Sequence, residues 1–202
     1  MKVMLYGMSQ RTITKEDIAI LPFSEKDLDS YIQAEHEMFP ALDSTNTDIS
    51  GATKQVFEQS ESTEYYSIFL RPDNTFCGKI ELQLNRHLSA PGIGITILKQ
   101  FQNQGIATLA IRKFCEYCLH DKGIHTLTVM IEKENDPSIR VFEKLGARYE
   151  GLKVPFSLEE HLRNMGVVLD PTILDAAKVH CYSLELPLLT PAVRDDSKSI
   201  VS

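Results

Sequence analysis

The residues best suited to chemistry form a short glycine-bearing turn, Gln102-Asn103-Gln104-Gly105-Ile106-Ala107. The turn opens a segment whose apolar residues recur every three or four positions, which predicts a helix. The first N–H groups of a helix have no intrahelical partner, and the positive end of its dipole favours anions. Small residues also let a ligand approach the backbone closely. The turn therefore predicts a pyrophosphate site, although a tight strand-to-helix connection would fit the same residues.

The segments around the turn predict the elements that position it. A β-rich run at 92–98 precedes the turn, and the helix that starts near Gln104 has Gly123 to cap its end. A second buried-looking strand covers 125–132. Asp136-Pro137 then places a cap and a proline at the head of a second helix, which Gly146 ends. The chemistry is thus predicted to lie in a strand–helix–strand–helix block.

The rest of the chain is predicted to add strands and short helices. Strands are expected at 17–21, 65–70, 76–84 and 179–186, and the middle two form a hairpin. Helices are expected at 24–38, 54–60 and 157–164, and another begins at Asp170. We expect an N-terminal arm at 1–16, a single domain at 17–187 and a polar tail at 188–202.

A second motif gives the block a family resemblance. Asn135-x-x-Ser138-x-x-x-Phe142-Glu-Lys-Leu-Gly146 follows the turn, and together the two motifs resemble the signatures of the GNAT N-acetyltransferase superfamily over roughly residues 76–151. The resemblance implies an α/β (α+β) fold with a mixed, mostly antiparallel central sheet, a splayed parallel strand pair and flanking helices. The pattern is most similar to the ribosomal-protein N-terminal and spermidine acetyltransferase branch. Its usual closing motif is absent, and residues 152–178 replace that motif here.

The resemblance also implies acetyl-CoA as cosubstrate and assigns residues to it. Pantothenate would pair with the backbone of the first strand at Ile95 and Ile97, and the turn would hold the pyrophosphate. Asn135 would bond the pantetheine arm, unless it serves only as a helix cap. The full set implied to bind the cofactor is Ile95, Ile97, Gln102, Asn103, Gln104, Gly105, Ile106, Ala107, Thr108, Asn135, Ser138 and Phe142.

The proton-transfer groups are less clear from the sequence. An alkyl amine has a pKa near ~10, so a base must deprotonate it before it attacks the thioester. We expect Glu132 or Glu81 as this base, with His87 third, although a solvated surface charge is the plainer interpretation of Glu132. In many members of the family a tyrosine that acts as general acid occupies the position of Phe142. In some, a glutamate occupies the position of Met130. These two positions favour an alternative, a non-catalytic acyl-CoA-binding sensor domain.

Composition limits the remaining possibilities. The net charge of −7 argues against a nucleic-acid partner, and no apolar run is long enough to span a membrane, so a cytoplasmic protein is expected. The histidines and cysteines lack metal-ligand spacing, so no metal is expected, and Cys115 and Cys118 are expected to be reduced helix residues. Acidic residues at 35–48 favour a cationic acceptor, a peptide N-terminus or a polyamine, although a solvated helix face and loop is the plainer interpretation. A homodimer is compatible with the sequence, and a nucleotide-binding protein stays as a third interpretation.

Overall fold

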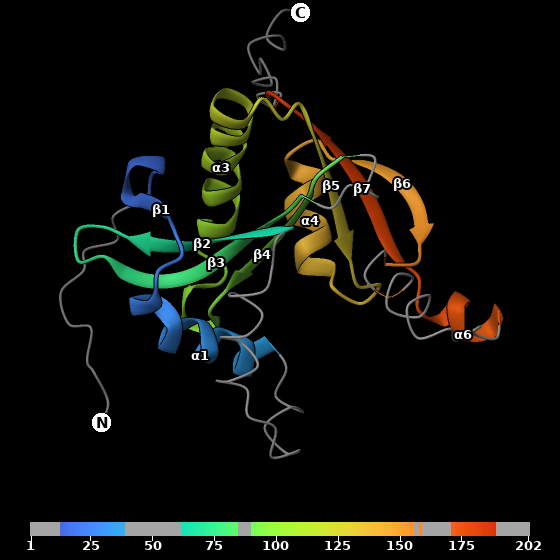
Figure 1. Cartoon of the computed structure of the whole chain (residues 1–202), viewed down its shortest axis with the longest axis horizontal. Helices are drawn as coiled ribbons and strands as arrows, with labels where there is room; N and C mark the ends of the chain where they lie inside the picture. Colours follow the sequence, from blue (N-terminus) through green and yellow to red (C-terminus); the bar gives the residue numbers. More distant parts are fainter. Residues whose placement is uncertain (1–12, 39–61, 85–89, 156–157, 159–170, 189–202) are drawn as a thin grey trace, which may run out of the picture.

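A seven-stranded mixed sheet forms the centre of the molecule (Figure 1). The computed structural model describes residues 13–38, 62–84, 90–155, 158 and 171–188. The strands are β1 (Ile18–Pro22), β2 (Thr63–Leu70), β3 (Thr75–Gln83), β4 (Gly92–Ile97), β5 (Thr126–Ile131), β6 (Arg148–Lys153) and β7 (Val179–Glu185). Their order across the sheet is β1-β2-β3-β4-β5-β7-β6. All neighbours are antiparallel except β4 and β5, which are parallel.

The parallel pair separates almost at once. Gly92 and Thr128 are the one residue pair in register between β4 and β5, and Thr128 N donates to Pro91 O at 2.8 Å. Beyond this point β4 continues to Ile97 and β5 to Ile131, and the two strands no longer pair with each other. The expected mixed, mostly antiparallel sheet with a splayed parallel pair is therefore confirmed.

Helices cover both faces of the sheet. The longest, α3 (Ile106–Lys122), lies on one face, and α1 (Leu28–Met38) lies on the other (Figure 1). A helix α4 (Asp136–Lys144) follows β5, and α6 (Pro171–Ala176) precedes β7. Short 3-10 turns precede three elements: η1 (Lys15–Asp17), η2 (Glu25–Asp27) and η4 (Lys99–Phe101). None of the helices in the described ranges is long and apolar enough to cross a membrane.

The alternation of side chains along β3 divides the core from the α1 face. Ile80 and Leu82 are fully buried and join the apolar cluster under α3 with Phe114. Lys79 and Glu81 point to the opposite face, where the Lys79 ammonium lies 5.6 Å from the ring centre of Tyr31 in α1. Successive strand residues face opposite sides, so one strand supplies both a core and a polar layer.

The predicted elements agree with the structure apart from their ends and one strand. The 24–38 helix begins as η2 before α1, and Asp27 Oδ2 accepts from Ser24 N at 3.1 Å. The strand β6 was not predicted, because all but one of its residues are exposed and a bulge at Tyr149–Gly151 interrupts its alternation. The helices predicted at 54–60 and 157–164 lie outside the described residues, apart from helical Leu158.

Candidate functional site

The predicted anion-binding turn connects β4 to α3. Gly105 adopts a left-handed conformation with φ of 79°, and a Cβ added there would meet no atom within 4 Å. The N–H groups of Ile106, Ala107 and Thr108 donate to no other residue in the described part of the chain. These donors therefore face open space at the positive end of a long helix, which suits an anion.

Two glutamine side chains fix the turn from within. Gln102 Nε2 donates to Ile97 O at 2.8 Å, and Gln104 Nε2 donates to Gln100 O at 2.9 Å. Asn103 adopts a positive φ of 60°, which asparagine tolerates better than most residues. The glutamine amides thus hold the backbone in shape, and the backbone N–H groups remain for a ligand.

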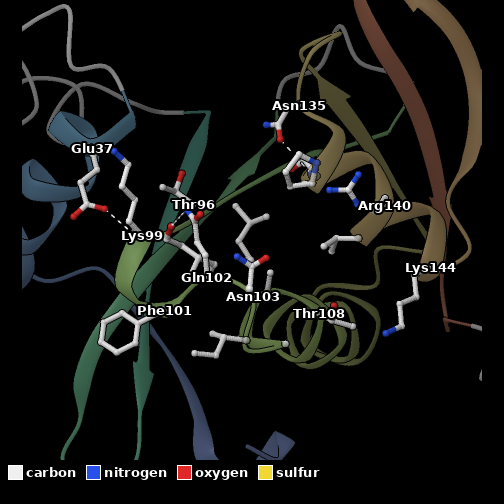
Figure 2. Close-up of a pocket in the computed structure, with 18 residues that line it drawn as sticks. Glu37, Thr96, Lys99, Phe101, Gln102, Asn103, Thr108, Asn135, Arg140 and Lys144 are labelled. Carbon is white, nitrogen blue, oxygen red and sulfur yellow. Dashed lines mark hydrogen bonds between the residues drawn. The ribbon is translucent and has the colours of Figure 1, made fainter. Parts of the chain in front are cut away.

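A pocket of about 540 Å³ extends from this turn into the opening between β4 and β5 (Figure 2). This volume is within the range of small-molecule and cofactor sites. Its walls come from the end of α1, from β4, from the turn and the start of α3, and from α4. The lining residues are Glu37, Ile95, Thr96, Ile97, Lys99, Phe101, Gln102, Asn103, Gly105, Ile106, Ala107, Thr108, Asn135, Pro137, Ser138, Arg140, Val141 and Lys144.

The structure brings together most of the residues implied to bind the cofactor. All of them line the pocket except Gln104, which is exposed in the turn, and Phe142. Asn135 Oδ1 accepts from Ser138 N at 3.2 Å, so Asn135 caps α4 while it lines the pocket. Phe142 is 2% exposed and belongs to the apolar core. Its expected contact with pantetheine therefore has no counterpart in the pocket wall.

Residues 11–148 match the family described as an acetyltransferase (GNAT) domain, which is more than half of the chain. The chain belongs to the GNAT acetyltransferase family. Among its relatives, Bacillus subtilis YjcK, described as a probable N-acetyltransferase, is 30% identical over 52% of this chain and 61% of its own length. The Escherichia coli spermidine N(1)-acetyltransferase is 27% identical over 55% of this chain and 59% of its own length. The chain thus spans about three fifths of the length of these relatives.

Solved structures of GNAT proteins share the fold. A chimera of Vibrio cholerae spermidine N-acetyltransferase SpeG and hSSAT superposes with a TM-score of 0.63 at 13% identity. The match covers 84% of this chain and 95% of the chimera. A GNAT acetyltransferase from Bacillus anthracis gives a TM-score of 0.59 at 18% identity. At such identities the similarity establishes the architecture and nothing finer.

The carboxylates predicted as bases occupy different places in this GNAT fold. Neither Glu132 nor Glu81 is among the pocket-lining residues, and Glu132 is exposed just beyond β5. Glu81 is paired in register with Gly94 of β4, and its Oε2 lies 3.6 Å from the position of a Cβ added at Gly94. Its carboxylate therefore overhangs β4 on the α1 face. His87 lies outside the described residues.

Lys79 holds Glu81 in this position. Lys79 Nζ lies 2.7 Å from Glu81 Oε1, and the lysine side chain is 3% exposed whereas that of Glu81 is 26% exposed. A buried cation requires such a partner because the loss of its hydration is costly. Sequence reasoning missed this pair, although a lysine and a glutamate two apart in an apolar strand were a visible signal.

Positive side chains in the pocket were also missed. Lys99, Arg140 and Lys144 line it, and Glu37 is the one carboxylate among its described lining residues (Figure 2). The net charge of −7 gives the chain as a whole no attraction for a polyanion. Local charge in this GNAT pocket is instead positive. Spacings of three and four residues place Arg140 and Lys144 on one helix face with Pro137 and Val141, and this pattern could have revealed them.

Glu37 connects α1 to the turn. Its Oε2 accepts from Lys99 N at 2.9 Å, which satisfies the first N–H group of η4 (Figure 2). The carboxylate therefore stands where the α1 side of the sheet meets the start of the anion-binding turn. The other acidic residues expected on this side have no described side chain.

The cysteines play no visible part in the pocket. Cys115 and Cys118 are buried in α3, and burial raises the pKa of each thiol to about 12. Both thiols are thus protonated at neutral pH and poor nucleophiles. The expected position of both cysteines within a helix is confirmed. The described residues contain no group of histidine, cysteine and acidic side chains arranged to hold a metal.

Proposed function

We propose that this GNAT protein is an N-acetyltransferase that transfers an acetyl group from acetyl-CoA to a primary amine. The observation that carries the proposal is one continuous pocket, which joins the free N–H groups of the turn to the opening between β4 and β5. The turn offers donors for a pyrophosphate, and the unpaired edge of β4 offers backbone groups for the pantetheine amides. Asn135 and Ser138 face this arm from α4.

The direction of β4 sets where the thioester would lie. The pyrophosphate site follows the carboxyl end of β4, so pantetheine would run backward along the strand past Ile97 and Ile95. The thioester then falls near Gly94, where the Glu81 carboxylate overhangs the strand. Glu81 therefore fits the role of general base better than Glu132, which lies beyond the far end of β5.

The chemistry follows from this placement. The amine nitrogen loses a proton to the carboxylate, directly or through water, and attacks the thioester carbonyl. The carbon–sulfur bond breaks, and the coenzyme A thiolate leaves with the electron pair. None of the described pocket-lining residues is a tyrosine, histidine or cysteine, so the proton that the thiolate takes up would come from water.

We assign the acceptor to the class of small cationic amines and peptide N-termini. Spermidine acetyltransferases are among the relatives, in sequence and in fold. Glu37 provides a carboxylate at the α1 end of the pocket, which would attract a cation. The likeness to these enzymes supports the class and not one compound.

A second function is a non-catalytic acyl-CoA-binding domain. It is favoured by Phe142, which cannot donate a proton and is buried away from the pocket. Such a domain would keep the turn and the α4 cap, which serve only to hold the cofactor. The two functions therefore differ in turnover and not in binding.

Calorimetry with acetyl-CoA, followed by a thiol-release assay, tests the proposal. The acceptor panel contains spermidine, spermine, a small monoamine and peptides with free N-termini. We expect binding with one molecule of thiol released per acetylated amine, confirmed by mass spectrometry of the product. Binding without release for every amine would favour the non-catalytic domain. No binding of acetyl-CoA would overturn both functions.

A further inference from the structure

Two cations of the pocket have no task in the proposed function. Arg140 and Lys144 stand one turn apart on α4, and their side chains project from the same face as Ser138 and Val141. Neither forms an ion pair or hydrogen bond with another of the residues that the structure describes. The pyrophosphate already has the N–H groups of the turn. These two charges are therefore available to a further anionic group of the ligand.

Their place along α4 identifies which part of the ligand they would meet. Asn135 caps the start of α4 beside the pantetheine arm, and Lys144 is its last residue. With a rise of about 1.5 Å per residue, the two ends of the helix are roughly 13 Å apart. Figure 2 shows Arg140 and Lys144 across the pocket from Asn103 and Thr108, at the turn. The cations thus lie toward the nucleotide end of the pocket and away from the thioester.

The nucleotide end of coenzyme A carries a phosphate monoester on its ribose. At neutral pH such a group bears a charge of about −1.5 to −2, and arginine and lysine are the side chains that bind it best. Acyl groups carried on phosphopantetheine, as on a carrier protein, lack this phosphate. Such donors also lack the pyrophosphate, so the matched comparison is acetyl-dephospho-CoA. A pocket that used only the pyrophosphate and pantetheine would bind this ligand as tightly as acetyl-CoA.

We propose that Arg140 and Lys144 bind the 3′-phosphate of coenzyme A and make the pocket selective for free acyl-CoA over donors that lack it. The inference rests on the proposed function, since it assumes that the pyrophosphate binds at the turn. It also explains how a chain with a net charge of −7 attracts a polyanion. Two cations placed at the pocket mouth offset the repulsion locally, within the screening distance of about 8 Å at physiological salt.

Calorimetry with two ligands separates this contact from all others. Wild-type protein is titrated with acetyl-CoA and with acetyl-dephospho-CoA, which lacks only the 3′-phosphate. A charge-assisted contact predicts roughly 10- to 100-fold weaker binding of the second ligand. In the variant Arg140→Gln/Lys144→Gln this preference should fall to about one, because acetyl-CoA loses affinity and acetyl-dephospho-CoA does not.

A control variant removes the same charge elsewhere. Lys26→Gln/Lys153→Gln replaces two exposed lysines that do not line the pocket, and it should retain the wild-type preference. Equal binding of both ligands by the wild type would overturn the inference and leave the proposed function standing. A double variant that weakens both ligands equally would overturn it too, since the cations would then contact the pyrophosphate. Failure of the wild type to bind either ligand would instead refute the proposed function, and the inference with it.

Discussion

The two sides of the pocket rely on different kinds of chemical group. The cofactor side, which consists of β4, α3, β5 and α4, presents backbone N–H groups of the turn and a free strand edge. The acceptor side consists of α1, whose Glu37 lines the pocket, and of the α1 face of β3, whose Lys79 and Glu81 lie beside the pocket without lining it. This side presents side chains. Backbone groups are supplied by the fold whatever the residue, whereas side chains differ from chain to chain. The cofactor side can therefore resemble distant relatives while the acceptor side does not.

The difference also concerns distance along the chain. The contacts that form the turn join residues four or five apart, such as Gln102 with Ile97. On the acceptor side, Glu37 meets Lys99 across 62 residues, and Asp27 meets Ser67 across 40. Local contacts form whenever the local sequence permits them. The long-range ones depend on how the whole sheet assembles.

The largest expected effect is loss of cofactor binding in Gly105→Glu. Gly105 and Gly123 stand at opposite ends of α3, both at positive φ and both with open space at the Cβ position. A non-glycine residue in this conformation costs about 1–2 kcal/mol in either place. We expect Gly105→Glu and Gly123→Glu to lose similar free energy of unfolding in urea. Calorimetry should show acetyl-CoA binding abolished in Gly105→Glu alone, because its carboxylate would meet the pyrophosphate.

If Gly105→Glu keeps the wild-type affinity while folded, the anion site is not at this turn. If Gly123→Glu loses binding as well, the effect comes from the helix and not from the ligand. Either result would remove the distinction between a cofactor side built from backbone and an acceptor side built from side chains.

The next effect is on turnover. Glu81→Gln should lower kcat about 100-fold or more, the usual scale for loss of a general base, with the Kd of acetyl-CoA unchanged. Glu132→Gln should leave kcat within about twofold, because Glu132 is exposed beyond the end of β5, whereas Glu81 lies over Gly94 of β4. Steady-state kinetics with the best amine of the panel measures both. The opposite ranking would place the base on β5 and so on the cofactor side.

Glu81→Gln has a structural consequence that must be separated from catalysis. It leaves the buried Lys79 ammonium without its carboxylate, which is costly in a dry site. Thermal unfolding of Glu81→Gln and of Lys79→Met/Glu81→Gln provides the control. The double variant should regain stability and not activity, since it removes the buried ammonium that lost its carboxylate but not the need for a base.

Features that depend on local contacts were predicted from the sequence, and features that depend on long-range contacts were not. The glycine-bearing turn at Gly105, the proline at the head of α4 and the apolar period of α3 are local features, and each was predicted from neighbouring residues. The edge strand β6 was not, since its exposed residues show no buried face and Gly151 breaks its register. The position of the Lys79 ammonium near Tyr31 and the contact of Glu37 with Lys99 need strand order and helix placement, which residue spacing does not contain.

A smaller effect is expected from Asn135, whose two amide atoms have separate roles. Its Oδ1 caps α4 by accepting from Ser138 N, which leaves Nδ2 for the pantetheine arm. Asn135→Asp keeps a good cap and removes the amide donor, whereas Asn135→Ala removes both. We expect both variants to weaken acetyl-CoA binding by about 1–2 kcal/mol. Only Asn135→Ala should also lose about 1 kcal/mol of stability, measured by urea unfolding. Wild-type affinity in Asn135→Asp would reduce Asn135 to a helix cap.

The smallest effect is expected from Glu37, which lies between the acceptor side and the cofactor side of the pocket. Glu37 lines the pocket and accepts from Lys99 N at the start of the turn. Glu37→Gln retains an oxygen that can accept this hydrogen bond but removes the charge. We therefore expect the binding free energy of a cationic acceptor to weaken by about 0.5–1 kcal/mol. We expect the KM for a cationic amine to rise a few-fold while the Kd of acetyl-CoA stays constant, measured in the same preparation. A neutral acceptor analogue should show no change in KM. If the Kd of acetyl-CoA changes as much as the KM does, Glu37 acts through the turn. Glu37 then belongs to the cofactor side, together with the side chains of α4.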